Sequence, residues 1–309
     1  MPSRPFAELH VHIEGTLEPD LVRALAARHR IRLPEWHASL NRPEDYRDLQ
    51  EFLDAYYGSI GVLRSAQDFH DLAAAYFARA AAAGVTHAEV FFDPQVHLER
   101  GVPLEAVLEG LDAAGREARA SGITVAWIAC VVRHLGGDAA LETVQRLVPH
   151  RDVVLGIGLD STEVGFPPVL FQEAFALARA EGFRITAHAG EEGGPEVVRD
   201  AIDLLGAERI DHGIRVMEDP ELVRRLADEQ VPLTVCPISN VRLKAVRSIE
   251  EHPLPAMLAA GLLVSVNSDD PAYFHGYLDA NIAALGEMGL SDAHVETLRA
   301  NSFEAAFLK

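Results

Sequence analysis

The sequence has little cysteine and little positive charge. Its 309 residues include only two cysteines, Cys130 and Cys236, which lie in separate apolar segments. A disulfide framework of the kind found in small secreted domains is therefore not expected. Basic residues number 27 against 47 acidic ones, giving a formal net charge of −20. Such a surface repels phosphate backbones and anionic headgroups, so we expect a small-molecule partner and neither nucleic acid nor a membrane.

Long apolar runs are also missing. No stretch is long enough to cross a bilayer, and the N-terminal MPSRPFAELH lacks the apolar core of a secretory signal, so we expect a cytoplasmic protein. No low-complexity tract, linker or repeat marks a domain boundary, which predicts a single domain over residues 1–309. The sequence leaves open whether this domain forms a homo-oligomer.

Two kinds of segment alternate along the chain. Short apolar, β-branched segments are typical of buried strands, and longer segments with apolar residues every three or four positions are typical of helices. Glycines such as Gly84 and Gly122 follow predicted helices and suit a helix C-cap. The predicted strands are 6–13, 85–93, 123–132, 154–160, 183–188, 209–212, 232–235 and 262–268. The main predicted helices between them are 72–83, 104–120, 140–147, 169–179, 196–205, 221–229 and 254–260.

Eightfold alternation of strand and helix predicts an α/β fold, the closed (β/α)8 TIM barrel. An open doubly wound sheet is the alternative, but no glycine-rich phosphate loop follows Ile13. About seventy residues, 16–83, separate the first two strands, and they contain helical patterns at 21–29, 49–58 and 66–83. We interpret these as extra helices inserted over one end of the barrel, either as a lid or as structural packing.

The active site of such a barrel lies at the carboxyl ends of its strands. Five of the predicted strands end in side chains that can bind a metal or transfer protons. These are His10, His12 and Glu14 on the first, Asp160 and Glu163 on the fourth, His188 and Glu191 on the fifth, Asp211 and His212 on the sixth, and Asp269 and Asp270 on the eighth.

Three histidines and one aspartate in this set suit a metal ion. His10 and His12 share one face of a strand because the strand period is two. Each residue alone has an ordinary structural explanation, but His10, His12, His188 and Asp269 at one end of one barrel form a His₃Asp set. Imidazole and carboxylate ligands suit Zn²⁺, with a water in the remaining position. We therefore predict one zinc ion per chain.

Two other metal arrangements are disfavoured. A carbamylated lysine on the fourth strand bridges the metals in many binuclear barrels, but the two lysines, Lys244 and Lys309, lie far from that strand. The segment 87–89, His-Ala-Glu, imitates the H-x-E of cytidine-type zinc deaminases, which also require a P-C-x-x-C pair that this chain lacks. We interpret 87–89 as part of the second strand.

A zinc site of this kind can attack an aromatic C–NH₂ carbon. The ion lowers the pKa of its water to about 7, and a ring nitrogen must be protonated as the carbon becomes tetrahedral. Glu191 is placed to be the acid, and His212 to orient the hydroxide. Asp270 is free to bond another ring nitrogen while Asp269 binds the metal. Glu191 also has a simpler interpretation, as a negative charge at the start of the next helix.

Five motifs resemble the adenosine/adenine deaminases of the amidohydrolase superfamily, in the order of that family. They are ELHVHIEGTLEP at 8–19, TAHAGE at 186–191, RIDHG at 209–213, VCPISN at 235–240 and VNSDDP at 266–271. The resemblance implies a (β/α)8 barrel with zinc on His10, His12, His188 and Asp269. It implies Glu191 as proton donor to purine N1, His212 as the group acting on the zinc-bound water, and Asp270 as the contact to N7.

Two positions resemble the adenine branch of this family. Glu14 stands where the adenosine branch carries an aspartate that reaches the ribose, and Ser161 matches a glycine whose backbone faces N3. The resemblance thus implies hydrolysis of adenine to hypoxanthine and ammonia, a purine-salvage reaction. One methylene is worth only about 1–3 kcal/mol in specificity, so adenosine, an N6-substituted adenine or a larger adenine nucleoside stays an alternative. A non-catalytic purine-binding barrel would need a missing catalytic group, and none is missing.

Overall fold

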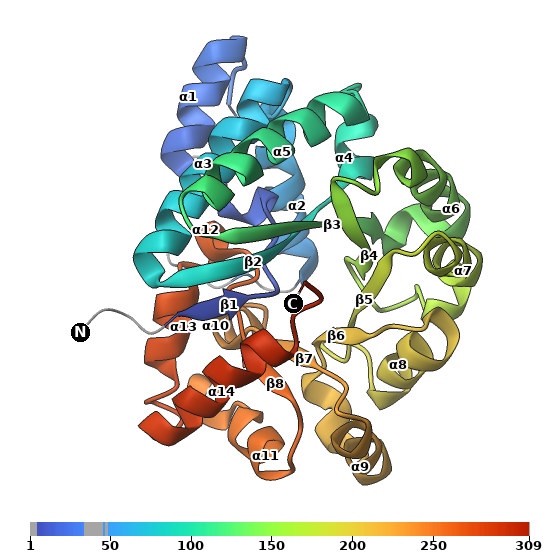
Figure 1. Cartoon of the computed structure of the whole chain (residues 1–309), viewed down its shortest axis with the longest axis vertical. Coiled ribbons are helices and arrows are strands. Elements are labelled where there is room, and N and C mark those ends of the chain that lie inside the picture. Colours follow the sequence, from blue (N-terminus) through green and yellow to red (C-terminus); the bar gives the residue numbers. More distant parts are fainter. Residues whose placement is uncertain (1–4, 34–45, 47–48, 309) are drawn as a thin grey trace.

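The predicted strands form one parallel sheet that closes into a barrel. The computed structural model describes residues 5–33, 46 and 49–308, and Lys309 lies outside them. Each strand pairs in parallel with the next in sequence order, and helices surround the ring (Figure 1). The strands are β1 (Phe6–Glu8), β2 (Val85–Phe92), β3 (Thr124–Val132), β4 (Val154–Asp160), β5 (Arg184–Ala189), β6 (Arg209–His212), β7 (Leu233–Val235) and β8 (Val264–Val266). The predicted (β/α)8 barrel is confirmed.

The barrel closes just beyond the ends of β1 and β8. Val11 forms a parallel bridge to Asp269, and the N–H of His12 donates to the carbonyl of Asp269 at 2.9 Å. The first strand is shorter than the predicted 6–13, because the N–H of Leu9 donates to the side-chain Oδ1 of Asn267 instead of to a backbone carbonyl. The two predicted metal ligands His10 and His12 therefore lie on the segment after β1.

Most of the helices lie where the periodicity placed them. Gly84 and Gly122 adopt the left-handed conformation, with φ of 88° and 97°, and so end the helices before them as expected. The helices that correspond to predicted ones are α1 (Pro19–His29), α2 (Leu49–Ser59), α3 (Ala66–Ala83), α5 (Leu104–Ala120), α6 (Gly136–Leu147), α7 (Gln172–Ala180), α8 (Pro195–Asp200), α9 (Pro220–Glu229) and α11 (Leu254–Ala259). Of these, α1, α2 and α3 lie between β1 and β2. Within the described ranges, no helix combines the length and apolarity needed to span a bilayer.

Helices that the periodicity did not indicate follow several strands. Three short ones begin at a proline immediately after a strand: α4 (Pro94–Leu98), α10 (Pro237–Arg242) and α12 (Pro271–Phe274). The C-terminal region adds α13 (Leu278–Ala284) and α14 (Asp292–Glu304). The three proline-initiated helices start at the carboxyl edge of the barrel and thereby redirect the chain beside the predicted site.

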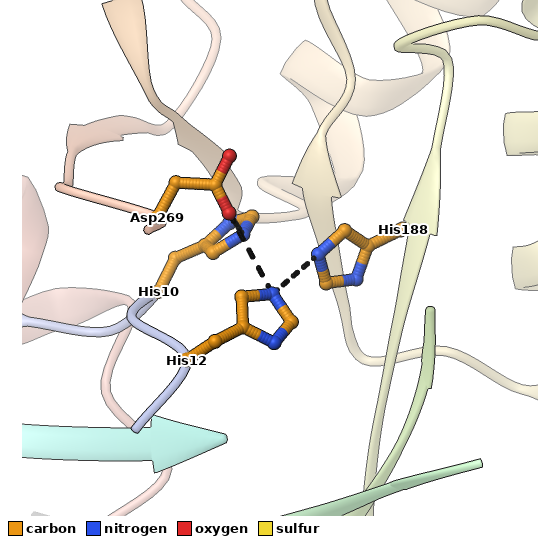
Figure 2. A group of neighbouring side chains, drawn as sticks. All are labelled: His10, His12, His188 and Asp269. Carbon is orange, nitrogen blue, oxygen red and sulfur yellow. Dashed lines mark hydrogen bonds and ion pairs between the residues drawn. The ribbon is translucent and has the colours of Figure 1, made fainter. Parts of the chain in front are cut away.

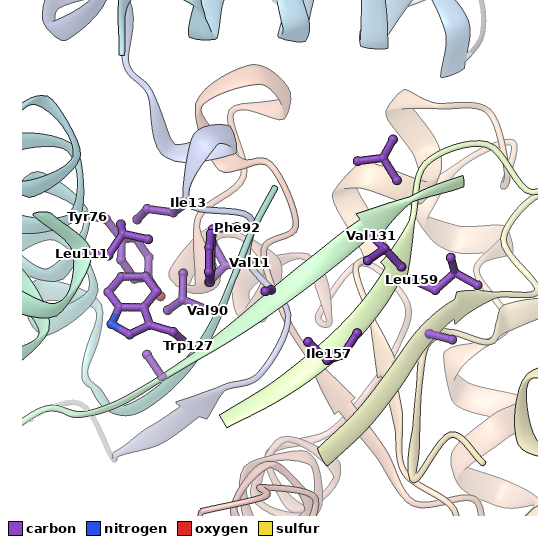
Figure 3. Packing of buried hydrophobic residues seen from close by; sticks show 14 of the residues in the cluster. Val11, Ile13, Tyr76, Val90, Phe92, Leu111, Trp127, Val131, Ile157 and Leu159 are labelled. Atoms are coloured by element: carbon purple, nitrogen blue, oxygen red, sulfur yellow. The ribbon is translucent and has the colours of Figure 1, made fainter. Parts of the chain in front are cut away.

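Two apolar layers hold the barrel. On the outside, Trp127 of β3 packs with Tyr76 of α3 and Leu111 of α5, between the strands and the helices (Figure 3). On the inside, Ile128 of β3 belongs to a separate buried cluster against which Phe307 of the C-terminal segment packs. The C-terminal segment, dark red in Figure 1, thus fills the centre of the ring of strands.

Candidate metal centre and substrate pocket

The four predicted metal ligands converge at the carboxyl edge of the barrel. His10 and His12 come from the segment after β1, His188 from β5 and Asp269 from the segment after β8 (Figure 2). All four are buried, and their ligand atoms lie within 4.8 Å of one another. His12 Nε2 lies 3.1 Å from His188 Nε2, and His10 Nε2 lies 3.2 Å from Asp269 Oδ1.

The arrangement of lone pairs in this cluster fits a cation. Nδ1 of His10 lies 3.2 Å from the carbonyl of Thr234, which can only accept, so Nδ1 carries the proton and Nε2 presents a lone pair. That lone pair then faces a carboxylate oxygen, and the Nε2 atoms of His12 and His188 face each other. Lone pairs at these distances repel one another unless a positive charge lies between them. The residues therefore fit a bound divalent metal ion.

The charge states agree with this interpretation. Burial lowers the pKa of His12 and, together with the neighbouring histidines, lowers that of His188 well below its usual range. Burial alone would raise the pKa of Asp269, but His10, His212 and His12 hold it well below its usual range. Neutral imidazoles and an ionised carboxylate are the forms that bind a metal.

Asp211 supports two of the ligands from beneath. Its carboxylate accepts hydrogen bonds from the hydroxyls of Thr186 at 2.6 Å and Thr234 at 2.9 Å. The Thr234 hydroxyl also lies 3.0 Å from Nδ1 of His10, and Nδ1 of His188 lies 3.6 Å from Asp211 Oδ2. Such partners orient metal-binding histidines. The sequence had indicated Asp211 as a candidate site residue because it lies at a strand end. Its role in orienting the histidines could not be predicted, because that role depends on contacts between strands.

Glu191 and His212 lie together beside the cluster. Oε2 of Glu191 is 3.5 Å from Nε2 of His212, which is itself 3.9 Å from Oδ2 of Asp269. Burial raises the pKa of Glu191 to about 7, so this carboxyl can hold a proton near neutral pH. Burial lowers the pKa of His212, but the charges of Glu191 and Asp269 outweigh this and raise it overall.

The loop that carries Glu191 is anchored by Glu163. The Glu163 carboxylate accepts hydrogen bonds from the N–H groups of Gly190, Glu191 and Glu192 at 2.9, 2.9 and 3.0 Å. The following helix, α8, begins only at Pro195. Fixing three consecutive N–H groups holds the backbone of Glu191 in one position relative to the metal ligands.

Sequence reasoning gave no role to two residues that orient the Glu191–His212 pair. The Nδ2 of Asn240 donates to Oε1 of Glu191 at 2.9 Å and lies 3.2 Å from Nδ1 of His212. His252 accepts the N–H of Leu254 on Nδ1, so its Nε2 carries the proton and donates to Oδ1 of Asn240 at 3.2 Å. The amide of Asn240 therefore has only one possible orientation. Asn240 lies in the VCPISN motif, whereas nothing in the sequence around His252 indicated a role.

A cavity lies directly above the cluster and encloses about 440 Å³, including its open mouth. It is lined by three of the predicted metal ligands, by Glu191 and His212, and by apolar and aromatic side chains of α2. The lining residues are His12, Phe52, Leu53, Tyr56, Tyr57, Asp93, Asp160, Ser161, His188, Glu191, His212, Leu243, Asp269 and Asp270.

Of the three predicted substrate-binding residues, two line this cavity. Asp270 is 5% exposed, and no donor among the described residues reaches its Oδ1. Burial and the charge of Asp269 raise the pKa of Asp270 well above its usual range. Ser161 adopts a φ of +71°, the left-handed conformation that glycine favours, so this backbone position would also accept the glycine that the resemblance places there in the adenosine branch.

The structure does not bring Glu14 into the cavity lining. This residue is fully buried, and its Oε1 accepts hydrogen bonds from the backbone N–H of Asp93 at 3.2 Å and from Nε2 of His97 at 2.8 Å. His97 lies on α4 and Asp93 immediately before it. The Glu14 carboxylate therefore supports the segment after β2, one layer behind the side chains that face a substrate.

An eight-stranded barrel with buried metal-binding side chains at the carboxyl ends of its strands has the architecture of a metal-dependent barrel hydrolase. The model of the adenosine deaminase family matches residues 5–309. The chain belongs to the adenosine deaminase family. An adenine deaminase of Streptomyces coelicolor is 53% identical over 99% of this chain and 91% of its own length.

Two solved structures resemble the whole barrel. The crystal structure of an adenine deaminase from Arthrobacter aurescens has a TM-score of 0.96 and 49% identity, covering 99% of this chain and 95% of that one. An amidohydrolase from Burkholderia ambifaria with bound Zn has a TM-score of 0.90 and 29% identity, covering 99% of this chain and 86% of that one.

Proposed function

We propose that this chain is a zinc-dependent adenine deaminase that hydrolyses adenine to hypoxanthine and ammonia. The observation that carries the proposal is a complete site in a chain about half identical to proteins named adenine deaminase. Of the four candidate metal ligands, His12, His188 and Asp269 line one cavity together with a protonatable Glu191 and with Asp270. Zinc is the metal we propose, one ion per chain, on His10, His12, His188 and Asp269. A zinc ion held there would activate a water molecule, bringing its pKa to about 7.

In the reaction, water adds to the C6–N1 bond of adenine, and the exocyclic amine is then released. The oxygen of water bonds to C6, the C6–N6 bond breaks, and the amine leaves as ammonia. Glu191 donates a proton to N1 as C6 becomes tetrahedral, and a pKa near neutrality suits this step. His212 faces the same space with Nε2 and orients the attacking water, whose two protons end as N1–H of hypoxanthine and in the ammonia. Asp270, carrying its own proton, donates to N7.

Positioning comes from the surrounding residues. Asn240 holds Oε1 of Glu191, which leaves Oε2 toward His212 and the cavity. The aromatic residues of α2, Tyr56 and Tyr57 among them, line the cavity and would pack against a bound purine ring. This position is consistent with the predicted lid. A small-molecule substrate and a cytoplasmic role in purine salvage follow from the same proposal, while adenosine or an N6-substituted adenine would use the same chemistry.

Glu191→Gln tests the proton donor. The amide cannot donate the acidic proton, so we expect turnover of adenine to fall by at least about 10³-fold, toward the upper end of general acid catalysis. Metal content, measured by mass spectrometry of the purified protein, should stay near one ion per chain. The matched control is Glu196→Gln, an exposed residue in the first turn of α8, which should keep full activity. Retention of most activity by Glu191→Gln would remove it from the mechanism.

A further inference from the structure

The carboxyl of Asp93 faces the substrate cavity, and the mechanism above gives it no role. Asp93 follows β2, is 2% exposed and precedes the first residue of α4. An aspartate at this position normally accepts a hydrogen bond from the first turn of its helix. Here the side chain caps nothing, and no N–H or O–H donor of the described residues reaches its Oδ1. A buried acceptor without a hydrogen bond costs about 1–3 kcal/mol of folding free energy. The presence of such an acceptor at Asp93 is explained if a bound ligand supplies the missing donor.

Asp93 is paired with a second carboxyl. Carboxylate oxygens of Asp93 and of Asp160, at the end of β4, lie within 4.8 Å of each other, and Asp160 is 4% exposed and also lines the cavity. No donor among the described residues reaches Oδ1 of either carboxyl, so the pair presents free acceptor oxygens.

The position of this pair relative to the metal ligands defines which part of a purine it can reach. His12 presents Nε2 to the ligand cluster and Nδ1 to Asp160, at 3.7 Å from its Oδ2. The carboxyl pair therefore lies one imidazole ring away from the metal centre. A purine with C6 at the metal centre, N1 at Glu191 and N7 at Asp270 presents its remaining polar atoms, N3 and N9, at the far edge.

The chemistry of the far edge matches the remaining polar residues of the cavity. N3 accepts a hydrogen bond, and the hydroxyls of Ser161 and Tyr57 can donate one. N9 of a free purine base carries the ring N–H, and the carboxyl pair supplies the acceptors that this group requires. In a nucleoside N9 bears a sugar and no hydrogen, so the buried acceptors would stay unsatisfied.

We propose that Asp93, supported by Asp160, accepts a hydrogen bond from N9–H of the free base and thereby selects free adenine over purines substituted at N9. This inference rests on the proposed function and adds the subsite that determines its substrate class. A site built to hydrogen-bond a substrate N–H rejects an analogue without it by about 10⁴–10⁵-fold when the acceptor is left buried and unpaired. The subsite differs from the Glu14 explanation, because the Glu14 carboxylate is not part of the cavity lining.

The test compares adenine with 9-methyladenine, which differs by replacement of N9–H with N–CH₃. For the wild-type enzyme, kcat/KM for ammonia release should be at least about 10³-fold lower with 9-methyladenine, allowing for partial relaxation of the site. In Asp93→Ala, kcat/KM for adenine should fall by about 10²-fold, whereas kcat/KM for 9-methyladenine should not change. The ratio of the two kcat/KM values should therefore decrease. The control substrate is 3-deazaadenine, which keeps N9–H and lacks N3, and Asp93→Ala should lower its kcat/KM by the same factor as that of adenine. The control variant is Glu99→Ala, at the exposed end of α4.

Each alternative gives a different result. Wild-type turnover of 9-methyladenine within about tenfold of adenine overturns the inference without any variant being needed. If Asp93→Ala raises kcat/KM for 9-methyladenine and leaves kcat/KM for adenine unchanged, Asp93 acts only by steric exclusion. That result also overturns the inference. A second bound zinc ion per chain that Asp93→Ala removes would make the pair metal ligands instead. Wild-type enzyme inactive on adenine overturns the proposed function itself, whereas active enzyme with an unchanged ratio in Asp93→Ala overturns only this subsite.

Discussion

A buried ion pair inside the barrel gives the sharpest stability prediction. Nη1 of Arg209, at the start of β6, lies 2.5 Å from Oε2 of Glu89 on β2, and both side chains are fully buried. Oε1 of Glu89 accepts hydrogen bonds from the backbone N–H groups of Phe307 at 2.7 Å and Leu308 at 3.0 Å. The Arg209 guanidinium also lies 4.0 Å from the centre of the Phe307 ring. The pair therefore joins two opposite strands and the C-terminal segment.

The size of the effect follows from the charge state of Glu89. Burial alone would raise the pKa of Glu89, but the charge of Arg209, with hydrogen bonds from His87 and Leu308, lowers it from 4.5 to about 2. A shift of this size corresponds to about 3 kcal/mol of folding free energy. Because the folded-state pKa is depressed, this contribution is complete above pH 4.5 and is lost as the pH falls toward about 2. Removing one partner of a buried pair costs about 3–5 kcal/mol, so we expect Arg209→Met to lower the free energy of unfolding by that amount at neutral pH.

Urea unfolding of the metal-loaded protein measures this loss. The matched control is Arg225→Met, because Arg225 pairs with Asp203 at a partly exposed site and should lose at most about 1 kcal/mol. The double variant Arg209→Met with Glu89→Gln removes both charges and should recover part of the loss. If Arg209→Met is no less stable than Arg225→Met, the buried pair does not hold the barrel as described.

Three further predictions concern residues around the site. Asn240→Ala removes a donor to Glu191 and should lower kcat by about 10- to 100-fold with the metal retained; loss of the metal would instead show a structural role. Because the Glu14 carboxylate lies behind the cavity lining, Glu14→Asp should leave the ratio of adenosine to adenine turnover unchanged, and a raised ratio would return Glu14 to substrate selection. Burial, with His212, lowers the pKa of His252 to about 4, so the folded protein excludes a proton that the unfolded chain binds, and its stability falls by up to about 3 kcal/mol as the pH decreases from 6.5 toward 4. The unfolding free energies of wild type and His252→Gln should therefore converge between about pH 7.5 and about pH 5, and parallel curves would contradict this.

The repeating pattern of the sequence was sufficient to predict the barrel and the edge at which the site lies. Strand periodicity and strand ends depend on local sequence, so His188 and Asp269 could be placed at one edge before any contact was known. The first strand was predicted too long because its pairing ends at a side chain, Asn267, that lies far away in the sequence. The proline-initiated α4, α10 and α12 were missed because these short segments carry too few apolar residues at helical spacing to show a period.

The residues that the sequence could not assign act through contacts between distant segments. His252 reaches Glu191 only through Asn240, and each of the three comes from a different loop or helix. Asp93 resembles an ordinary helix-capping aspartate in the sequence, and only the three-dimensional arrangement shows that it caps nothing and lies beside Asp160. A single sequence carries no signal for such pairings.

The central claim is most directly tested by measuring ammonia release from adenine and from adenosine, side by side, with the zinc-loaded protein. We predict rapid release from adenine and little or none from adenosine. A preference for adenosine would keep the zinc-dependent mechanism but contradict the assignment of adenine as substrate. No ammonia from either compound would contradict the proposed function.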